Sequence, residues 1–286
     1  MSGKRPPRHI QQPLAATICG DSAISTFNGK MTMTAYLDYN IFTAIEDGDF
    51  TINKIFDKVD KHINNFPFSA AHIQEVDNIF ADTDELRDSF IAKRLNTIKQ
   101  ITNCSYIFQE IPSNKIYWLT EEPTIVLETI RQVPFAKTSM KIFMNFISNE
   151  QKEHLRQTLG INTKELNNYS PKQVIQHLNT KLTNWGTQDN FLQLLDKAIS
   201  FHPNKKDFGQ HNNIAGVMEL LDMLGYWKDK VTETSNYARL WDSNHIHFAS
   251  YCDYLISDDK RLRYKAKVVY DIYSISTKIV SSNGIE

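Results

Sequence analysis

The sequence predicts an α/β protein with a mostly parallel central sheet flanked by helices and with an inserted helical subdomain. Short apolar runs end abruptly at polar residues, and segments with helical spacing lie between these runs. One long polar stretch in the middle of the chain has a helical pattern with repeated breaks, at Gly160, Ser170-Pro171 and Gly186. Strands that alternate with helices are typical of a parallel sheet that carries helices on both faces.

The N-terminal residues differ from the rest of the chain. Residues 1–30 contain Pro, Gly and Ser without a sustained period, and they lack an apolar region long enough for a secretory signal. We expect a flexible extension here and a folded domain over residues 31–286. The alternative is that the natural chain starts at Met31 or Met33.

The expected elements follow from apolar spacing and turn residues. In order they are a strand at 35–38, a helix or turn at 40–45, a helix at 49–63, a strand at 66–69, a helix from 70 that Ser69 caps, a helix at 84–102, a hairpin around 112–114, a helical insertion at about 122–205, a core helix at 214–227, a helix at 239–251, a strand at 252–257, a basic helix at 259–275 and a strand at 277–280.

Composition limits the functional classes. The 286 residues carry 32 Lys and Arg against 33 Asp and Glu, a formal charge of -1, so a nucleic-acid partner needs a local basic patch. Three cysteines without a Cys-x-x-Cys pair argue against a disulfide framework or zinc knuckle and suit a reducing compartment, hence a cytoplasmic protein. The sequence contains no run of about 18 apolar residues, so it predicts no membrane span.

Four acids fall at the ends of the expected elements. Asp38 ends the first strand, and Asp259, with Asp258 beside it, follows the strand "DYLIS". Glu75 lies early in the helix after residue 69, and Asp242 opens the helix "WDSNHIHFASYC". The carboxyl ends of parallel strands share one edge of the sheet with helix starts, so these acids can converge there.

Convergence requires a counter-charge. Two carboxylates about 5 Å apart repel by roughly 3 kcal/mol at an effective dielectric near 20. Without a cation some of them must take up protons. All-oxygen ligation suits Mg²⁺ or Mn²⁺ better than zinc, and such an ion activates water and stabilises a phosphoryl transition state.

The same segments resemble the PIN-like nuclease superfamily, which comprises metal-dependent ribonucleases and related 5′ nucleases. The resemblance lies in "YLDYN", "SAAHIQE", "DSNHIHFAS" and "DYLISDDKRL", in this order and over residues 31–80 and 239–282. It implies parallel strands with flanking helices, one or two Mg²⁺ or Mn²⁺ ions, and hydrolysis of a phosphodiester by metal-activated water. The long helical stretch between the two ends is extra to this resemblance.

The resemblance also implies residue roles. Carried over by position, the metal-binding and catalytic acids are Asp38, Glu75, Asp242 and Asp259, with Asp258 as a substitute or assistant for Asp259. Asn40, Ser257 and His245 are expected to orient these carboxylates by hydrogen bonds.

A basic run follows Asp259 directly. It consists of Lys260, Arg261, Arg263, Lys265 and Lys267. Such a run is commonly a solvated helix face, but its position favours phosphate contacts by Lys260, Arg261 and Arg263. His72 and His247 are expected on helix surfaces, and the four tryptophans in the core.

Together these observations predict a divalent-metal-dependent endonuclease that acts on RNA in preference to DNA, in the setting of a toxin or antiviral defence effector. One alternative is a non-catalytic PIN-like module that binds RNA or protein. Another is a metal-dependent phosphatase with an Asp nucleophile, although that chemistry favours a second acid where this chain has Asn40. A regulatory protein partner, the role of the insertion and the oligomeric state stay open.

Overall fold

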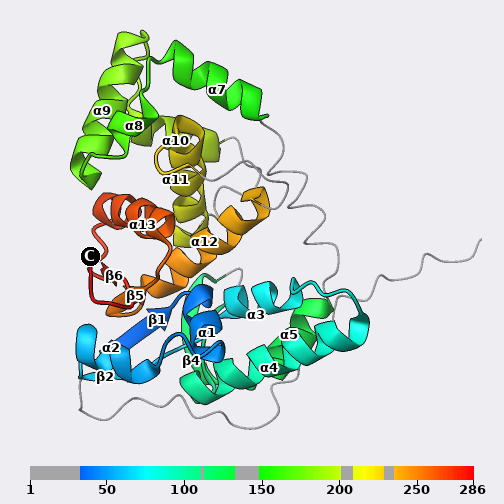
Figure 1. Ribbon diagram of the computed structural model, residues 1–286. Helices are drawn as coiled ribbons and strands as arrows, with labels where there is room; N and C mark the ends of the chain where they lie inside the picture. The colour runs from blue at the N-terminus through cyan, green and yellow to red at the C-terminus, as the bar shows by residue number, and fades with distance from the viewer. Residues whose placement is uncertain (1–32, 111–112, 133–147, 201–208, 229–234) are drawn as a thin grey trace, which may run out of the picture. The chain divides into compact units, whose positions relative to one another are not determined.

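The described part of the chain folds as a mostly helical α/β protein with two sheets (Figure 1). The computed structural model describes residues 33–110, 113–132, 148–200, 209–228 and 235–286. The expected α/β class with a parallel central sheet is confirmed. The expected N-terminal extension lies outside the described residues.

The central sheet has four parallel strands in the order β2-β1-β5-β6. These are β1 (Met33–Leu37), β2 (Ile63–Asn65), β5 (Tyr254–Ile256) and β6 (Lys278–Val280). Tyr36 pairs with Leu255 and Leu37 with Ile256, so β1 and β5 end together although they are far apart in sequence. This register brings the residues after both strands to one edge, as the sequence predicted.

Both faces of the sheet are covered. Successive side chains of a strand point to opposite faces. Leu37 and Ile256 accordingly pack in one apolar cluster with the helices of the N-terminal part, whereas Tyr36 and Leu255 pack in another with the helices that follow. The residues of β1 and β5 are apolar in succession because a parallel sheet is buried on both sides.

A second, antiparallel sheet confirms the expected hairpin. It consists of β3 (Ser105–Glu110) and β4 (Lys115–Thr120). Phe68 joins it through an isolated parallel bridge to Tyr106. The expected strand at 66–69 is therefore reduced to this bridge.

The helix expected at 49–63 is also shorter in the structure. It is α2 (Ile52–Lys58), and Ile63 begins β2 instead. The Asp60 carboxylate accepts a hydrogen bond from the backbone nitrogen of His62 (2.9 Å), a local turn that competes with continued helix. This turn is the physical reason for the difference.

The remaining helices follow the sequence expectations closely. They are α1 (Tyr39–Glu46), α3 (Ala70–Asp77), α4 (Asp84–Thr102), α5 (Pro123–Arg131), α7 (Asn149–Thr158), α8 (Thr163–Leu166), α9 (Pro171–Asn184), α10 (Phe191–Ser200), α11 (Gln210–Leu224), α12 (Ser235–Ala249) and α13 (Lys260–Ile272). Among the helices that the structure describes, none combines the length and apolar character needed to cross a lipid bilayer.

The expected insertion at 122–205 contains α5 and α7 to α10. Apolar residues of α8 and α9, such as Leu166 and Val174, pack in the same cluster as Tyr36 and Leu255 of the central sheet. The helices from α7 onward therefore share one core with α11, α12 and α13.

A buried charge cluster ties three of these helices together. Asp222 of α11 lies 3.3 Å from the Lys152 ammonium of α7 and 3.6 Å from the Lys265 ammonium of α13. All three side chains are buried. Charges removed from water are tolerated only when they are paired, so each member of the cluster depends on the others.

Replacing Asp222 with Ala should therefore lower the free energy of unfolding by about 3–5 kcal/mol, because two buried ammonium groups lose a carboxylate. Urea unfolding of the full chain measures the loss. Asp271→Ala, at an exposed position of α13, is the control and should change stability by about 0.5 kcal/mol or less. Equal stability of both variants would contradict this role of Asp222.

Candidate functional site

The site is built around Asp38, the residue directly after β1. Its backbone nitrogen continues the sheet by donating to the Ile256 carbonyl (2.8 Å). Its carboxylate caps α1, since Oδ1 accepts from the backbone nitrogen of Tyr39 (2.8 Å). The second oxygen, Oδ2, accepts from the Ser257 hydroxyl at 2.6 Å. Asp38 is only 5% exposed, so the fold fixes a carboxylate inside the protein at the sheet edge.

Ser257 links the ends of the two central strands. Its Oγ donates to Asp38 and accepts from the backbone nitrogen of Asp259 (3.0 Å). Asp259 in turn caps α13, because its Oδ1 accepts from the backbone nitrogens of Arg261 and Leu262. The predicted orienting role of Ser257 toward Asp38 is thus visible as a direct hydrogen bond.

A second acid approaches from α3. Oε2 of Glu75 lies 2.8 Å from Nε2 of His245 on α12. Nδ1 of the same imidazole lies 2.8 Å from the Tyr36 hydroxyl of β1. An ionised carboxylate only accepts hydrogen bonds, so Nε2 of His245 carries a proton and donates a hydrogen bond to Glu75. The chain Glu75–His245–Tyr36 therefore connects two helices to the central strand.

The network continues to Ser69 and His72 at the start of α3. The Tyr36 hydroxyl lies 2.6 Å from Oγ of Ser69. Nδ1 of His72 accepts from the backbone nitrogen of Ser69 (3.0 Å), and Nε2 donates to the Leu37 carbonyl (2.7 Å). His72 is fully buried, so its expected place on a helix surface is wrong. The capping box of α3 and the backbone of β1 take both of its nitrogens.

Electrostatics show that the acids and His245 lie close together. Burial raises the pKa of the Asp38 carboxyl from 3.8 to about 6, and Glu75 adds to this increase while His245 opposes it. Burial would lower the pKa of His245, but Glu75, Asp38 and Asp242 together raise it above its ordinary value. Burial and His245 hold the pKa of His72 well below its ordinary value. These acids therefore favour the protonated form of the His245 imidazole.

The structure therefore brings only some of the predicted acids together. Asp38, Glu75 and Asp242 act on the same imidazole, and Asp259 joins them through Ser257. Asp258 is exposed, and its Oδ1 accepts from the backbone nitrogen of Ser282 (2.9 Å) in the C-terminal loop.

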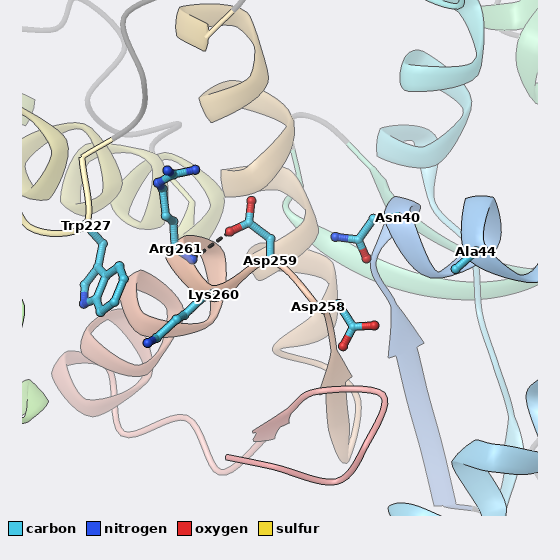
Figure 2. Close-up of a pocket in the computed structure, with 7 residues that line it drawn as sticks. All are labelled: Asn40, Ala44, Trp227, Asp258, Asp259, Lys260 and Arg261. Carbon is cyan, nitrogen blue, oxygen red and sulfur yellow. Dashed lines mark hydrogen bonds between the residues drawn. The ribbon is translucent and has the colours of Figure 1, made fainter. Parts of the chain in front are cut away.

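An open pocket of about 550 Å³ lies next to this group (Figure 2). It is lined by Asn40, Ala44, Trp227, Asp258, Asp259, Lys260 and Arg261. Oδ1 of Asn40 is buried and has no hydrogen-bond partner. In Figure 2 the residues run from Trp227 past Lys260 and Asp259 to Asn40, so the pocket connects the start of α13 with the end of β1.

The basic helix has a more divided role than its sequence predicts. Lys260 and Arg261 line the pocket. Arg263 donates through Nη1 to the Ser257 carbonyl (2.7 Å) and so supports the strand end. Lys265 is buried against Asp222. The predicted substrate contacts of Lys260 and Arg261 keep a structural basis, whereas Arg263 is engaged with the backbone beside the acids.

His247 also differs from expectation. It is fully buried, not on the surface, and its ring packs against His211 and Tyr251. Burial lowers the pKa of its imidazole to about 3. The inward face of α12 explains this position, because Ser243, one turn earlier on the same face, is also buried.

Two residues of the site were missed from sequence. Tyr36 looked like an ordinary strand residue, although a buried Tyr hydroxyl requires a polar partner. Trp227 was placed in the core, but it is partly exposed and lines the pocket. The sequence signal for Trp227 was its position after Gly225, at the end of α11.

The donors fit a hard cation by their chemistry, because Mg²⁺ and Mn²⁺ prefer carboxylate and amide oxygens. Their arrangement is not a coordination shell. Within the described ranges, no group of three or more His, Cys, Asp or Glu side chains is placed so that it could hold a metal ion. Oε2 of Glu75 is engaged with His245, and both oxygens of Asp38 accept hydrogen bonds from protein groups.

Comparisons of the chain with models of protein families, with curated proteins and with solved structures find no match.

The buried Asp38 carboxyl predicts a pH effect on stability. Its pKa is higher in the folded than in the unfolded chain, so the folded state binds more protons between pH 3.8 and 6 and loses stability as pH rises through this window. Asp38→Asn should remove this loss, which amounts to about 3 kcal/mol. Unfolding of both proteins in urea with EDTA at pH 4, 5, 6 and 7 measures the difference.

The expected result is that the variant gains stability relative to the native protein as pH rises from 4 to 6, with no further change above pH 7. A difference that is constant with pH would contradict a raised pKa for Asp38.

Proposed function

We propose that this protein is a divalent-metal-dependent nuclease of the PIN-like kind, which hydrolyses phosphodiester bonds in RNA in preference to DNA. One observation carries the proposal. A buried carboxylate, Asp38, is held at the carboxyl edge of a parallel sheet, where Glu75 of α3 and His245 of α12 act on it, and Asp242 of α12 acts on the same imidazole. The order of these acids along the chain and their elements are those that the family resemblance implies.

The proposed cation is Mg²⁺ or Mn²⁺, held by Asp38 with Glu75, Asp242 and Asp259. When bound, such an ion lowers the pKa of a coordinated water and places positive charge beside the phosphate. For Glu75 to join, its carboxylate must exchange the hydrogen bond to His245 for the ion. Burial, with a smaller contribution from Glu75, raises the pKa of Asp38, so a cation beside this carboxylate would favour its ionised form.

The other residues orient and balance these acids. The Ser257 hydroxyl and the backbone of Tyr39 fix both oxygens of Asp38, so this carboxylate needs no reorganisation on binding. His245 can hold a proton between Glu75 and Tyr36. The Tyr36 hydroxyl both donates and accepts, so it can serve either protonation state of the imidazole.

Charge supports a polyanionic substrate only locally. The whole chain is nearly neutral, but Lys260 and Arg261 line the pocket that adjoins the acids. Phosphate contacts by such residues position a nucleic-acid backbone without reading its sequence.

A non-catalytic module that binds RNA or protein is the second candidate. The observation that favours it is that Asp38, Glu75 and Asp259 already have protein hydrogen-bond partners. In such a module the Glu75–His245 pair would have a structural role only, which is to hold α3 and α12 together.

A cleavage assay separates these candidates. The native chain is incubated with mixed-sequence single-stranded RNA and DNA in Mg²⁺, in Mn²⁺ and in EDTA, with a small phosphomonoester in parallel. The proposal predicts cutting of RNA that requires the metal. It also predicts that Asp38→Asn reduces the rate at least 100-fold, since that substitution removes a ligand charge at an otherwise preserved position.

The matched control is Asp271→Asn, an exposed acid near the C-terminal end of α13, opposite the end that Asp259 caps, and it should retain the native rate. Metal-independent binding of RNA without any cutting would favour the module. Faster turnover of the phosphomonoester than of RNA would favour a phosphatase.

A further inference from the structure

An aromatic pair stands at the end of the pocket away from Asn40. Trp227 follows α11, and Tyr264 lies in α13. Their ring centroids are 4.5 Å apart and the rings are inclined by only 22°, so they are stacked. Both rings are partly buried and pack against the same apolar cluster, and of the two only Trp227 lines the pocket.

Lys260 borders this stack. Its ammonium lies 4.9 Å from the Trp227 centroid and 5.7 Å from the Tyr264 centroid. If the ammonium lay over the face of Trp227 that points away from Tyr264, its distance from the Tyr264 centroid would approach the sum of two distances: that between the two rings and that between the ammonium and the Trp227 centroid. The ammonium therefore lies beside the pair and not on the face of the indole that points away from Tyr264.

The backbone holds Trp227 in place before any ligand arrives. The φ angle of Trp227 is +44°, an uncommon value for a bulky residue, and its backbone nitrogen donates a hydrogen bond to Oδ1 of Asn167 (2.6 Å). Gly225, two residues earlier, has a φ angle of +91°, and a Cβ there would lie 2.5 Å from Thr163. The turn is thus packed tightly against α8, which lowers the entropy cost of using Trp227 for binding.

The charges around the pocket indicate what kind of ligand fits. Lys260 and Arg261 are offset by Asp258 and Asp259 on the same walls. A free phosphate or another small anion would therefore gain little net attraction. A ligand that joins a flat aromatic ring to a phosphate can use the indole face and the two cations together, and a nucleotide unit has both parts.

We propose that Trp227, backed by Tyr264, stacks on one nucleobase of a single-stranded nucleic acid, while Lys260 and Arg261 contact the adjoining phosphate. This subsite lies beside the proposed cleavage site, and the inference rests on the proposed nuclease function for the identity of its ligand. Stacking accepts any base, so the subsite selects unpaired strands and not a sequence. A base inside a duplex is stacked on its neighbours and cannot occupy it.

Binding measured without catalysis tests this inference. The full native chain is titrated in EDTA with fluorescein-labelled ten-nucleotide RNA and DNA and with the same strands as duplexes, and anisotropy gives the Kd. Trp227→Ala should weaken binding of single strands about tenfold, the range found for loss of one stacked base. Trp227→Phe should stay within about threefold of the native Kd, because a phenyl ring still stacks.

Trp185→Ala is the matched control, since Trp185 is 54% exposed and lies at the end of α9. It should leave the Kd unchanged. Quenching of tryptophan fluorescence by the unlabelled strand should persist in Trp185→Ala and be lost in Trp227→Phe, a readout that a folding defect would not produce selectively.

The inference is overturned if Trp227→Ala binds single strands as tightly as the native chain, if duplexes bind as well as single strands, or if the native chain binds neither. Each result can be told apart from failure of the nuclease proposal. Strand binding that depends on Trp227, without metal-dependent cutting, would remove the nuclease activity and keep the subsite. Cutting that is unaffected by Trp227→Ala, together with unchanged binding, would remove the subsite and keep the nuclease.

Discussion

The burial of a single carboxylate at the end of the central strand constrains everything around it. Asp38 cannot move away from the sheet, because its backbone pairs with β5 and its side chain caps α1. It also cannot be left alone, because a buried charge without partners costs several kcal/mol. The hydroxyl of Ser257 and the imidazole of His245 stabilise the charged carboxylate of Asp38. Each comes from an element that the parallel register brings to the same edge of the sheet. A change in that register would separate Asp38 from both.

The positive and negative charges at the site do not cancel, and this leaves a role for a bound cation. One imidazole faces three acids, so negative charge remains in excess when all of them are ionised. A hard cation could supply the missing charge, provided that Glu75 gives up its hydrogen bond to His245. The site therefore combines one fixed candidate ligand, Asp38, with a second candidate, Glu75, whose side chain has to rotate away from His245 to bind an ion. The pocket next to it adds groups that suit a nucleotide: the partly exposed indole of Trp227 and the cations of Lys260 and Arg261.

Sequence reasoning found the parts of this arrangement that local chemistry determines. The strands were predicted from apolar runs that stop at Asp38 and Ser257. The helix starts were predicted from the cap at Ser69 and from the basic run that follows Asp259. It failed where tertiary packing decides. His72 and His247 have the spacing of surface helix residues, yet both are buried, because the helices present those faces to the sheet and to α11. Lys265 sits in a basic run but lies inside, where Asp222 from a distant helix meets it. Trp227 became part of the pocket through a turn whose geometry depends on α8.

Titration with Mn²⁺ tests the shared-cation account most directly. The native chain and Asp38→Asn are titrated at pH 7.5 without nucleic acid, and free Mn²⁺ is followed by electron paramagnetic resonance. The account predicts at least one Mn²⁺ per native chain, displaced by Mg²⁺, and affinity at least tenfold weaker in Asp38→Asn. Equal binding by the two proteins, or no binding by the native chain at millimolar Mn²⁺, would contradict it.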